Sequence, residues 1–187
     1  KGRSEVYLKD NAALDRYLVE AGTAGRVLET SGGARGGQEL AALVEHAMRF
    51  RSLMGFVPRR YDPAVIEALA LSGALEPDLD KPAREASLTR AAEWLGRSDR
   101  EARWQAALLD DGSVRVERLW RGVTDVFPIG AAFLASAEAR KLARLAGETA
   151  DVYAGGARFV RAAAAADVVE PEQLDEAVDD EAESAPV

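Results

Sequence analysis

The sequence predicts an α+β fold in which helices alternate with short strands and a β-hairpin lies near residues 103–120. Apolar residues recur at helical spacing in several separate segments. Alternating apolar and polar residues also flank Asp110-Asp111-Gly112, and Asp-Gly between such runs is a strong hairpin signal. The chain has 187 residues and is 48% apolar, which is enough to form one core or two smaller ones. We therefore expect one domain or two sub-domains.

The first part of the chain predicts short strands and three helices. Each helix is recognised by apolar residues three and four apart, and by an aspartate cap, glycine or proline at its boundaries. In chain order we expect a strand at 5–9, a helix at 11–21 capped by Asp10, a strand at 26–30, a flexible glycine-rich loop at 31–37, a helix at 38–54, and a helix from Pro63 to about Ser72 capped by Asp62.

The second part begins with a segment, 76–82, that holds two prolines and four charged residues, a composition typical of a linker between sub-domains. This predicts a first unit at 1–75, a second at 83–166 and an acidic exit helix or tail at 167–187. Further expected elements are a helix around 88–95 that ends at Gly96, hairpin strands at 103–109 and 113–120, a helix at 136–146, a strand at 158–160 and a weakly amphipathic acidic helix at 172–183.

Charge is unevenly distributed along the chain. The net charge is −8, but nine acidic residues and no basic ones lie in 167–187, so residues 1–166 hold 23 acidic against 24 basic side chains. Because salt screens exposed charges over about 8 to 10 Å, the net charge alone does not exclude nucleic acid as a partner.

The absence of cysteine excludes disulfides and thiolate sites and agrees with a reducing compartment. No apolar run approaches the roughly 20 residues of a membrane helix, so we expect a soluble, cytoplasmic protein.

Sequence patterns for catalysis and metal binding are weak. The chain has no Gly-x-x-x-x-Gly-Lys-Ser/Thr phosphate loop, and the Gly32–Gly37 cluster is interpreted as a loop. His46 is the only histidine, which excludes a histidine triad or two-histidine metal site within this chain. Asp78 and Asp80 have the spacing of a magnesium-binding pair but lie between prolines, so we interpret them as linker residues. We expect no catalytic residue and no metal ligand here.

Arginines beside aromatic residues are the remaining candidates for a binding site. Guanidinium groups bind phosphate through paired donors and stack on rings. Arginines on a surface strand more often only solvate the surface or form ion pairs with neighbouring acids such as Glu117. The candidates for DNA binding are Arg49, Arg51, Arg59, Arg60, Arg115, Arg118 and Arg121.

Five segments, in order, resemble a known insertion. They are Lys1 to Leu18, Arg59-Arg60-Tyr61 with Pro63 and Ile66, Arg121-Gly-Val-Thr-Asp-Val126, Ala137-Glu-Ala-Arg140 and Pro171-Glu-Gln-Leu-Asp175. Together they resemble the insertion in the metal-binding catalytic (TOPRIM) domain of the DNA gyrase B subunit from Gram-negative bacteria, especially its alphaproteobacterial forms. Because Lys1 begins the chain without an initiator methionine or leader, we expect a piece of a longer protein. The acidic end of the chain departs from the family, where basic residues are common.

The resemblance implies an accessory domain without catalytic residues of its own. It implies that the insertion braces neighbouring gyrase elements, supports DNA binding, and supports the coupling of ATP hydrolysis to strand passage by an ATP-dependent type II topoisomerase. It also implies that magnesium and ATP are bound elsewhere in the parent protein, and that the partners are the rest of the gyrase B subunit, the gyrase A subunit, and double-stranded DNA. The alternative is a protein-protein interaction module that makes no DNA contact.

Overall fold

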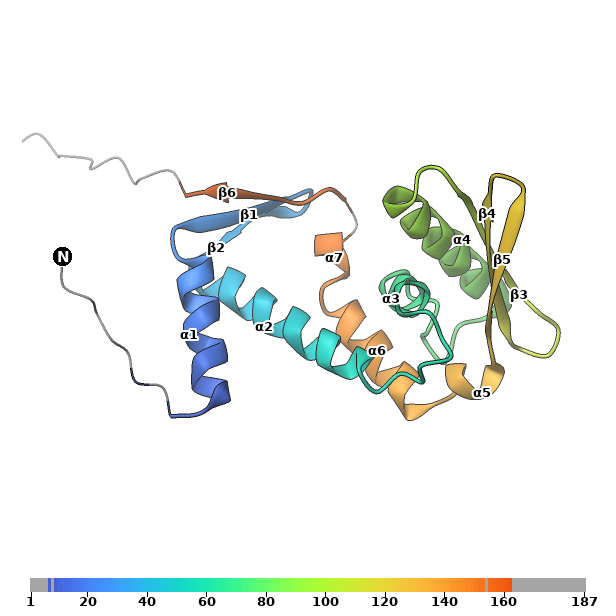
Figure 1. Cartoon of the computed structure of the whole chain (residues 1–187), viewed down its shortest axis with the longest axis horizontal. Coiled ribbons are helices and arrows are strands. Elements are labelled where there is room, and N and C mark those ends of the chain that lie inside the picture. The colour runs from blue at the N-terminus through green and yellow to red at the C-terminus, as the bar shows by residue number, and fades with distance from the viewer. Residues whose placement is uncertain (1–6, 8, 154, 163–187) are drawn as a thin grey trace, which may run out of the picture.

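The computed structural model describes Tyr7, residues 9–153 and residues 155–162, and the fold is α+β as expected (Figure 1). In chain order the elements are α1 (Asn11–Thr23), β1 (Arg26–Thr30), β2 (Gly33–Gly36), α2 (Gly37–Met54), α3 (Pro63–Leu71), α4 (Lys81–Ser98), β3 (Arg103–Leu108), β4 (Val114–Trp120), β5 (Val123–Ile129), α5 (Ala131–Leu134), α6 (Ala137–Gly147), α7 (Ala150–Tyr153) and β6 (Arg158–Arg161).

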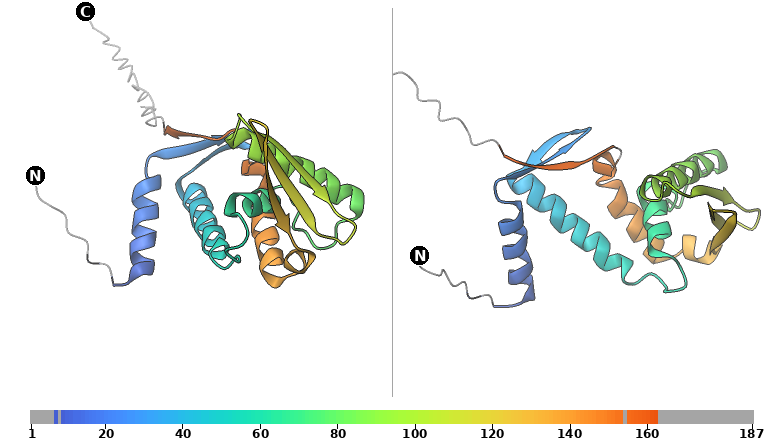
Figure 2. Two further views of the ribbon diagram at one scale, coloured as in Figure 1. Left: turned by 45° about the vertical axis from the view of Figure 1, so that its right-hand side comes forward. Right: turned by 45° about the horizontal axis from the view of Figure 1, so that its top comes forward.

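Two antiparallel three-stranded sheets lie at opposite ends of an elongated molecule (Figures 1 and 2). The first sheet has the order β2-β1-β6, and the second has the order β3-β4-β5. Helices α2 and α6 pack against each other between the two sheets. The chain thus builds part of the first sheet, forms the other end of the molecule, and returns to complete the first sheet with β6.

The main hydrophobic core surrounds α3 and includes side chains from α4, α6 and the second sheet. Its fully buried large side chains include Val65, Ile66, Leu69, Leu75, Leu88, Val114, Val116, Ile129 and Leu142. A smaller cluster, formed by Leu28, Leu40 and Val152, lies under the first sheet. The alternation predicted for β4 is confirmed, because Val114 and Val116 are buried while Arg115 is exposed.

Aspartate caps mark the starts of three helices. The carboxylates of Asp10, Asp62 and Asp80 accept hydrogen bonds from backbone N–H groups in the first turns of α1, α3 and α4. The predicted caps at Asp10 and Asp62 are therefore confirmed. Helix α4, expected around 88–95 with its end at Gly96, runs from Lys81 to Ser98. It begins earlier than expected because Asp80 caps it and proline is tolerated in a first turn.

The segment 76–82, predicted as a linker, lies beside the main core. Arg84 donates hydrogen bonds to the carbonyl oxygens of Ala74 and Glu76 at 2.8 and 2.9 Å, and these bonds fasten the segment to α4. Buried side chains before and after the segment belong to the same core. The division into 1–75 and 83–166 remains a prediction, and the structure shows apolar packing that continues across its boundary.

Two strands differ from the expectation. Residues 33–36, expected within a flexible loop, form β2 and pair with β1. Gly36 suits this pairing because a Cβ there would lie only 3.2 Å from a methyl group of Val27. Strand β5 is not among the strands that the sequence pattern predicts; it pairs with β4 through a two-residue turn in which Arg121 and Gly122 both have positive φ, a feature of tight hairpins.

Two further expectations fall partly or wholly outside the described residues. Tyr7 and Lys9, the described members of the expected strand 5–9, are not in a strand. The acidic helix expected at 172–183 lies outside the described part of the chain. Within the described part, no helix is both long enough and apolar enough to cross a membrane.

Candidate nucleic-acid interface

The first arginine group comprises Arg49, Arg51, Arg59 and Arg60, at the end of α2 and in the loop that follows. Arg49 forms an ion pair with Glu45 on the same helix at 3.6 Å. The Arg60 guanidinium lies 4.8 Å from the ring centroid of the buried Tyr61 and donates a hydrogen bond to its hydroxyl group at 3.0 Å. Arg51 and Arg59 are exposed. The group is therefore a set of mostly exposed charges around one helix end.

The second arginine group comprises Arg115 and Arg118 on β4 and Arg121 in the turn that follows. The strand alternation places Arg115 on the outer face of the sheet, where Arg103 of β3 is also exposed. Arg115 forms an ion pair with Glu117 at 3.0 Å. Half-exposed Leu119 and Val126 share this face, so the outer surface of the sheet is basic and partly apolar.

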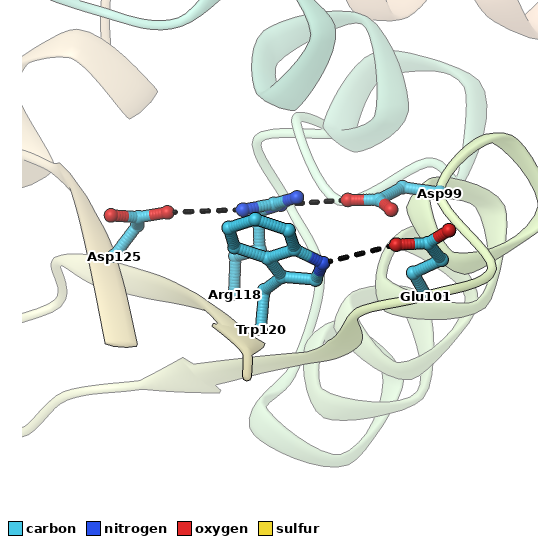
Figure 3. Close-up of polar contacts among 5 residues, drawn as sticks. All are labelled: Asp99, Glu101, Arg118, Trp120 and Asp125. Carbon is cyan, nitrogen blue, oxygen red and sulfur yellow. Dashed lines mark hydrogen bonds and ion pairs between the residues drawn. The ribbon is translucent and has the colours of Figure 1, made fainter. Parts of the chain in front are cut away.

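Arg118 lies on the opposite, core-facing side of β4 and is held by two carboxylates (Figure 3). Its Nε donates to Asp99 at 2.6 Å and its Nη1 donates to Asp125 at 3.2 Å. The Asp99 hydrogen bond is the main cause that raises the pKa of Arg118 above its ordinary value. Only 25% of the side chain is exposed. Arg118 thus ties β4 to β5 and to the end of α4.

Stacked rings complete this cluster. The Arg118 guanidinium lies 6.0 Å from the ring of Trp104 and 5.5 Å from the ring of Trp120. The indole N–H of Trp120 donates to Glu101 at 3.2 Å (Figure 3). Trp104 stacks on Phe127 of β5 with ring centroids 5.8 Å apart. These contacts fix the indole of Trp120 next to the β4–β5 turn.

The β4–β5 turn, formed by Arg121 and Gly122, exposes Arg121, and Val123 follows it as the first residue of β5. The Arg121 guanidinium lies 4.7 Å from the ring centroid of Trp120 and 3.9 Å from a carboxylate oxygen of Glu101. The side chain of Arg121 remains 73% exposed, and Val123 is 60% exposed. The turn therefore exposes the Arg121 guanidinium to solvent while the Trp120 ring restricts its conformation.

The two arginine groups do not form one surface. Arg49 and Arg51 belong to α2, whereas Arg115 belongs to a sheet on the far side of α3 (Figures 1 and 2). Sequence reasoning identified the arginines but missed Asp99, Glu101 and Asp125. The acids that hold Arg118 come from the end of α4 and from β5, which the sequence did not predict. Had β5 been recognised, its register would have placed Asp125 directly opposite Arg118.

The other candidate residues have structural contacts. A ring nitrogen of His46 lies 2.7 Å from the carbonyl oxygen of Leu145, which links α2 to α6. Asp80 caps α4 and therefore is not simply a solvated linker residue. Asp111 accepts hydrogen bonds from the hydroxyl and backbone N–H of Ser113, which lower the pKa of its carboxyl group. Among the described residues, no group of histidine, aspartate and glutamate side chains is placed to hold a metal ion.

Comparison with known proteins identifies the family. Residues 30–182 match the model of the DNA gyrase B subunit insert domain. The DNA gyrase B subunit of Caulobacter vibrioides (strain NA1000 / CB15N) is 33% identical over 162 residues, which cover 86% of this chain and 19% of that protein. The DNA gyrase B subunit of Rickettsia conorii (strain ATCC VR-613 / Malish 7) is 22% identical over 178 residues, covering 93% of this chain and 22% of that protein.

The chain thus spans about a fifth of the length of these curated relatives. The match extends from the end of β1 to beyond β6, so it covers the whole described fold except α1 and most of β1. The expected resemblance is confirmed: the chain belongs to the family of DNA gyrase B subunit insert domains.

Proposed function

We propose that this domain is a non-catalytic accessory insert that supports DNA binding by gyrase and couples ATP hydrolysis to strand passage. The family assignment supports the proposal, as does the span of the chain, which is a fraction of each relative. On this proposal ATP and magnesium are bound elsewhere in the gyrase B subunit, and the partners are the rest of that protein, the gyrase A subunit, and double-stranded DNA. The domain contributes a surface and a rigid body to that assembly.

The DNA-binding part of the proposal rests on the β4–β5 turn, where the ring of Trp120 holds the guanidinium of Arg121. Arg121 is 73% exposed while its guanidinium is ordered by the Trp120 ring. An ordered arginine loses less conformational entropy when it binds a phosphate oxygen than a free one. Arg103 and Arg115 lie exposed on the outer face of the same sheet and can follow the phosphate backbone further.

Arg118 has an indirect role in this proposal. Its donors already bind Asp99 and Asp125, and a phosphate would have to displace a carboxylate to reach it. We assign Arg118 to positioning Trp120, and through Trp120 the guanidinium of Arg121. Of the first arginine group, Arg51 and Arg59 are the better phosphate ligands because Arg49 and Arg60 have contacts within the chain.

Fluorescence anisotropy of a labelled DNA duplex tests direct contact. The chain should bind at low salt, with an affinity that falls linearly with salt on a logarithmic scale, as expected when phosphate contacts release counterions. Combined Arg115→Glu and Arg121→Glu substitutions should weaken binding at least about tenfold, because each lost phosphate contact is replaced by repulsion. Neither substitution removes a contact of Arg118.

A matched control reverses two exposed arginines that lie on helices outside the second sheet. Arg16→Glu with Arg144→Glu produces the same change in net charge on α1 and α6. If both double variants weaken binding equally, the second sheet is not the contact surface. If the unaltered chain, folded by circular dichroism, causes no anisotropy change at low salt, the isolated domain does not bind duplex DNA.

Coupling requires a test in the whole enzyme. Gyrase whose B subunit carries the Arg115→Glu and Arg121→Glu changes should supercoil fewer turns per ATP hydrolysed than the unaltered enzyme, measured in one reaction. A parallel loss of ATP hydrolysis and supercoiling, with their ratio unchanged, would contradict a coupling role and indicate a general loss of enzyme.

The second candidate function is a protein-interaction module without DNA contact. It is favoured by the apolar part of the outer sheet face, where Leu119 and Val126 are 41% and 49% exposed beside Arg115. Such mixed surfaces are common at protein interfaces. Leu119→Ser with Val126→Ser should then weaken association with the rest of gyrase in a pull-down while leaving DNA affinity of the isolated chain unchanged. Weaker DNA binding by the isolated chain, with unchanged association in the pull-down, would favour the DNA surface.

A further inference from the structure

An apolar groove lies at the other end of the molecule, between α1, α2 and β6. It consists of two adjoining hollows of about 550 and 300 Å³, which share Val44, Met48 and Phe159 in their walls. Phe159 is 55% exposed, Met48 40% and the neighbouring Leu18 56%. Large apolar side chains gathered at one place on a surface usually mark a site where another segment binds. We call this feature the α1–α2 groove.

Positive charge borders one end of the groove. Arg26 of β1 and Arg161 of β6 are direct cross-strand partners, and like charges in this position destabilise a sheet. Both are exposed, and no acidic side chain of the described residues forms an ion pair with either. The strand alternation puts them on the same sheet face as Leu28 and Phe159, which line the groove. Arg51 lines its wall on α2.

The segment that follows β6 in the sequence has the complementary chemistry. Residues 167–187 contain nine acidic side chains and no basic one. Leu174, Ala177 and Val178 have the spacing of one apolar face of a helix. The described chain ends at Ala162, whose N–H donates to the carbonyl oxygen of Gly25 at 2.9 Å, next to the Arg26–Arg161 pair. About 12 residues separate this point from Leu174 and can span up to about 40 Å, which is enough to reach any part of the groove.

We propose that residues 167–187 bind in the α1–α2 groove of the same chain. The apolar row Leu174, Ala177 and Val178 packs on Met48 and Phe159, and the flanking carboxylates offset the charges of Arg26, Arg51 and Arg161. The contact buries the exposed apolar side chains of Leu18, Met48 and Phe159 and holds the segment that follows β6 against α1 and α2. It does not depend on the DNA surface of the second sheet.

The two methionines of the chain provide a test and its internal control. Met48 lines the groove, whereas Met54 packs against the main core. In the full chain labelled with ¹³C at the methionine methyl groups, Leu174→Asp should shift the Met48 signal and leave Met54 unchanged. Gln173→Asp adds the same charge at the neighbouring position off the apolar row, and should leave both signals nearly unchanged. Raising the salt to about 1 M, where screening acts over about 3 Å, should shift Met48 in the direction of Leu174→Asp.

Disulfide trapping tests the same contact in another way, because the natural chain has no cysteine. The pair Ala47→Cys and Ala177→Cys should form a disulfide within one chain, since Ala47 lines the groove. The pair Ala132→Cys and Ala177→Cys is the control, because Ala132 is exposed on α5 at the other end of the molecule. The first pair should react many times faster and migrate as a monomer on a non-reducing gel.

Three results would overturn the proposal. An unchanged Met48 signal in Leu174→Asp would show that the tail does not reach the groove. Equal trapping rates for the two cysteine pairs would show random collision of a tethered segment. Dimers as the main product of the first pair would show that a second copy occupies the groove. None of these results bears on DNA binding by Arg115 and Arg121, so the two proposals fail separately.

Discussion

Arg121 combines backbone strain with an ordered, exposed charge. It is the only described residue other than glycine with positive φ, at 50°, a region in which an ordinary side chain costs about 1–2 kcal/mol. Asparagine followed by glycine is the preferred pair in such a turn. Exposed stacking on Trp120 recovers only about 0.5–1 kcal/mol. A strained residue whose cost is not offset locally is a reason to look for function.

We therefore predict that Arg121→Asn separates stability from binding. The free energy of unfolding should rise by up to about 1 kcal/mol, because relief of backbone strain exceeds the lost stacking. Affinity for duplex DNA should fall in the anisotropy experiment. Urea unfolding measures the first quantity. A variant that is less stable than the natural chain would show that the stack, rather than the turn, dominates the energy of this residue.

Asp111 makes a small contribution to stability that depends on pH. Hydrogen bonds from the Ser113 hydroxyl, at 2.6 Å, and from its backbone N–H lower the pKa of the Asp111 carboxyl group. A lowered pKa in the folded state means that the stabilisation is present above the unfolded pKa and is lost as pH falls through the folded pKa. Ser113→Ala removes the hydroxyl donor and should raise the pKa of Asp111.

An NMR titration of the Asp111 side chain measures this change directly. The natural chain and Ser113→Ala should differ in stability at neutral pH and converge in acid, where the carboxyl group is protonated in both. A Ser113→Ala protein whose stability deficit grows in acid would contradict the proposed cause.

At the scale of elements, the capping of α4 distinguishes two aspartates that look equivalent in the sequence. Asp80 accepts a hydrogen bond from Ala83 N at 2.8 Å, whereas Asp78 lies exposed two residues earlier. Asp80→Ala should lower the free energy of unfolding by about 1 kcal/mol, the usual cost of a lost cap, and Asp80→Asn should lower it much less. Asp78→Ala should stay within about 0.5 kcal/mol of the natural chain. Equal effects at the two positions would argue against capping.

Elements with strong local signals could be predicted from the sequence, and those that depend on partners could not. Asp62-Pro63 indicates the start of α3, and Asp-Gly at 111–112 indicates the hairpin, because caps and turns are local. Strand β2 is Gly-Ala-Arg-Gly, and nothing in its residues favours a strand until β1 is beside it. Strand β5 contains Asp125 and Pro128, which are rare in strands, and it is tolerated at the edge of the sheet.

The candidate site also combines local features that the sequence predicts with long-range contacts that it does not predict. The alternation of β4 places Val114, Val116, Arg118 and Trp120 on one face, as the sequence predicts. Local pattern could not show that Arg118 lies between Asp99 and Asp125, because those carboxylates are brought to it by a helix end and by the unpredicted β5. The arginine that looks central in the sequence is consequently the least available of its group.

The whole molecule is organised by contacts between distant parts of the chain. Strand β6 pairs with β1, and the Arg158–Glu29 ion pair at 3.0 Å joins residues 129 positions apart. The smaller cluster of Leu28, Leu40 and Val152 therefore draws on both ends of the described chain. The sequence division at 76–82 follows the order of the chain, whereas these contacts unite 26–44 with 150–161. Residues 50–57, at the end of α2 and just after it, pack instead on the main core formed by 61–146.

Hydrogen exchange in the native state decides between these divisions. Cooperative units follow buried apolar contacts, so β1, β2 and β6, which lie on the small cluster, should open together and with lower protection than β4, which lies on the main core. Leu40→Ala should reduce protection in β1 and β6 and leave β4 nearly unchanged. Leu88→Ala, which costs about 2–5 kcal/mol in the main core, should reduce protection of α3 and α4 together. If instead residues before 76 and after 82 exchanged as two separate units, the linker prediction would be correct and the core shared across it would contribute little cooperativity.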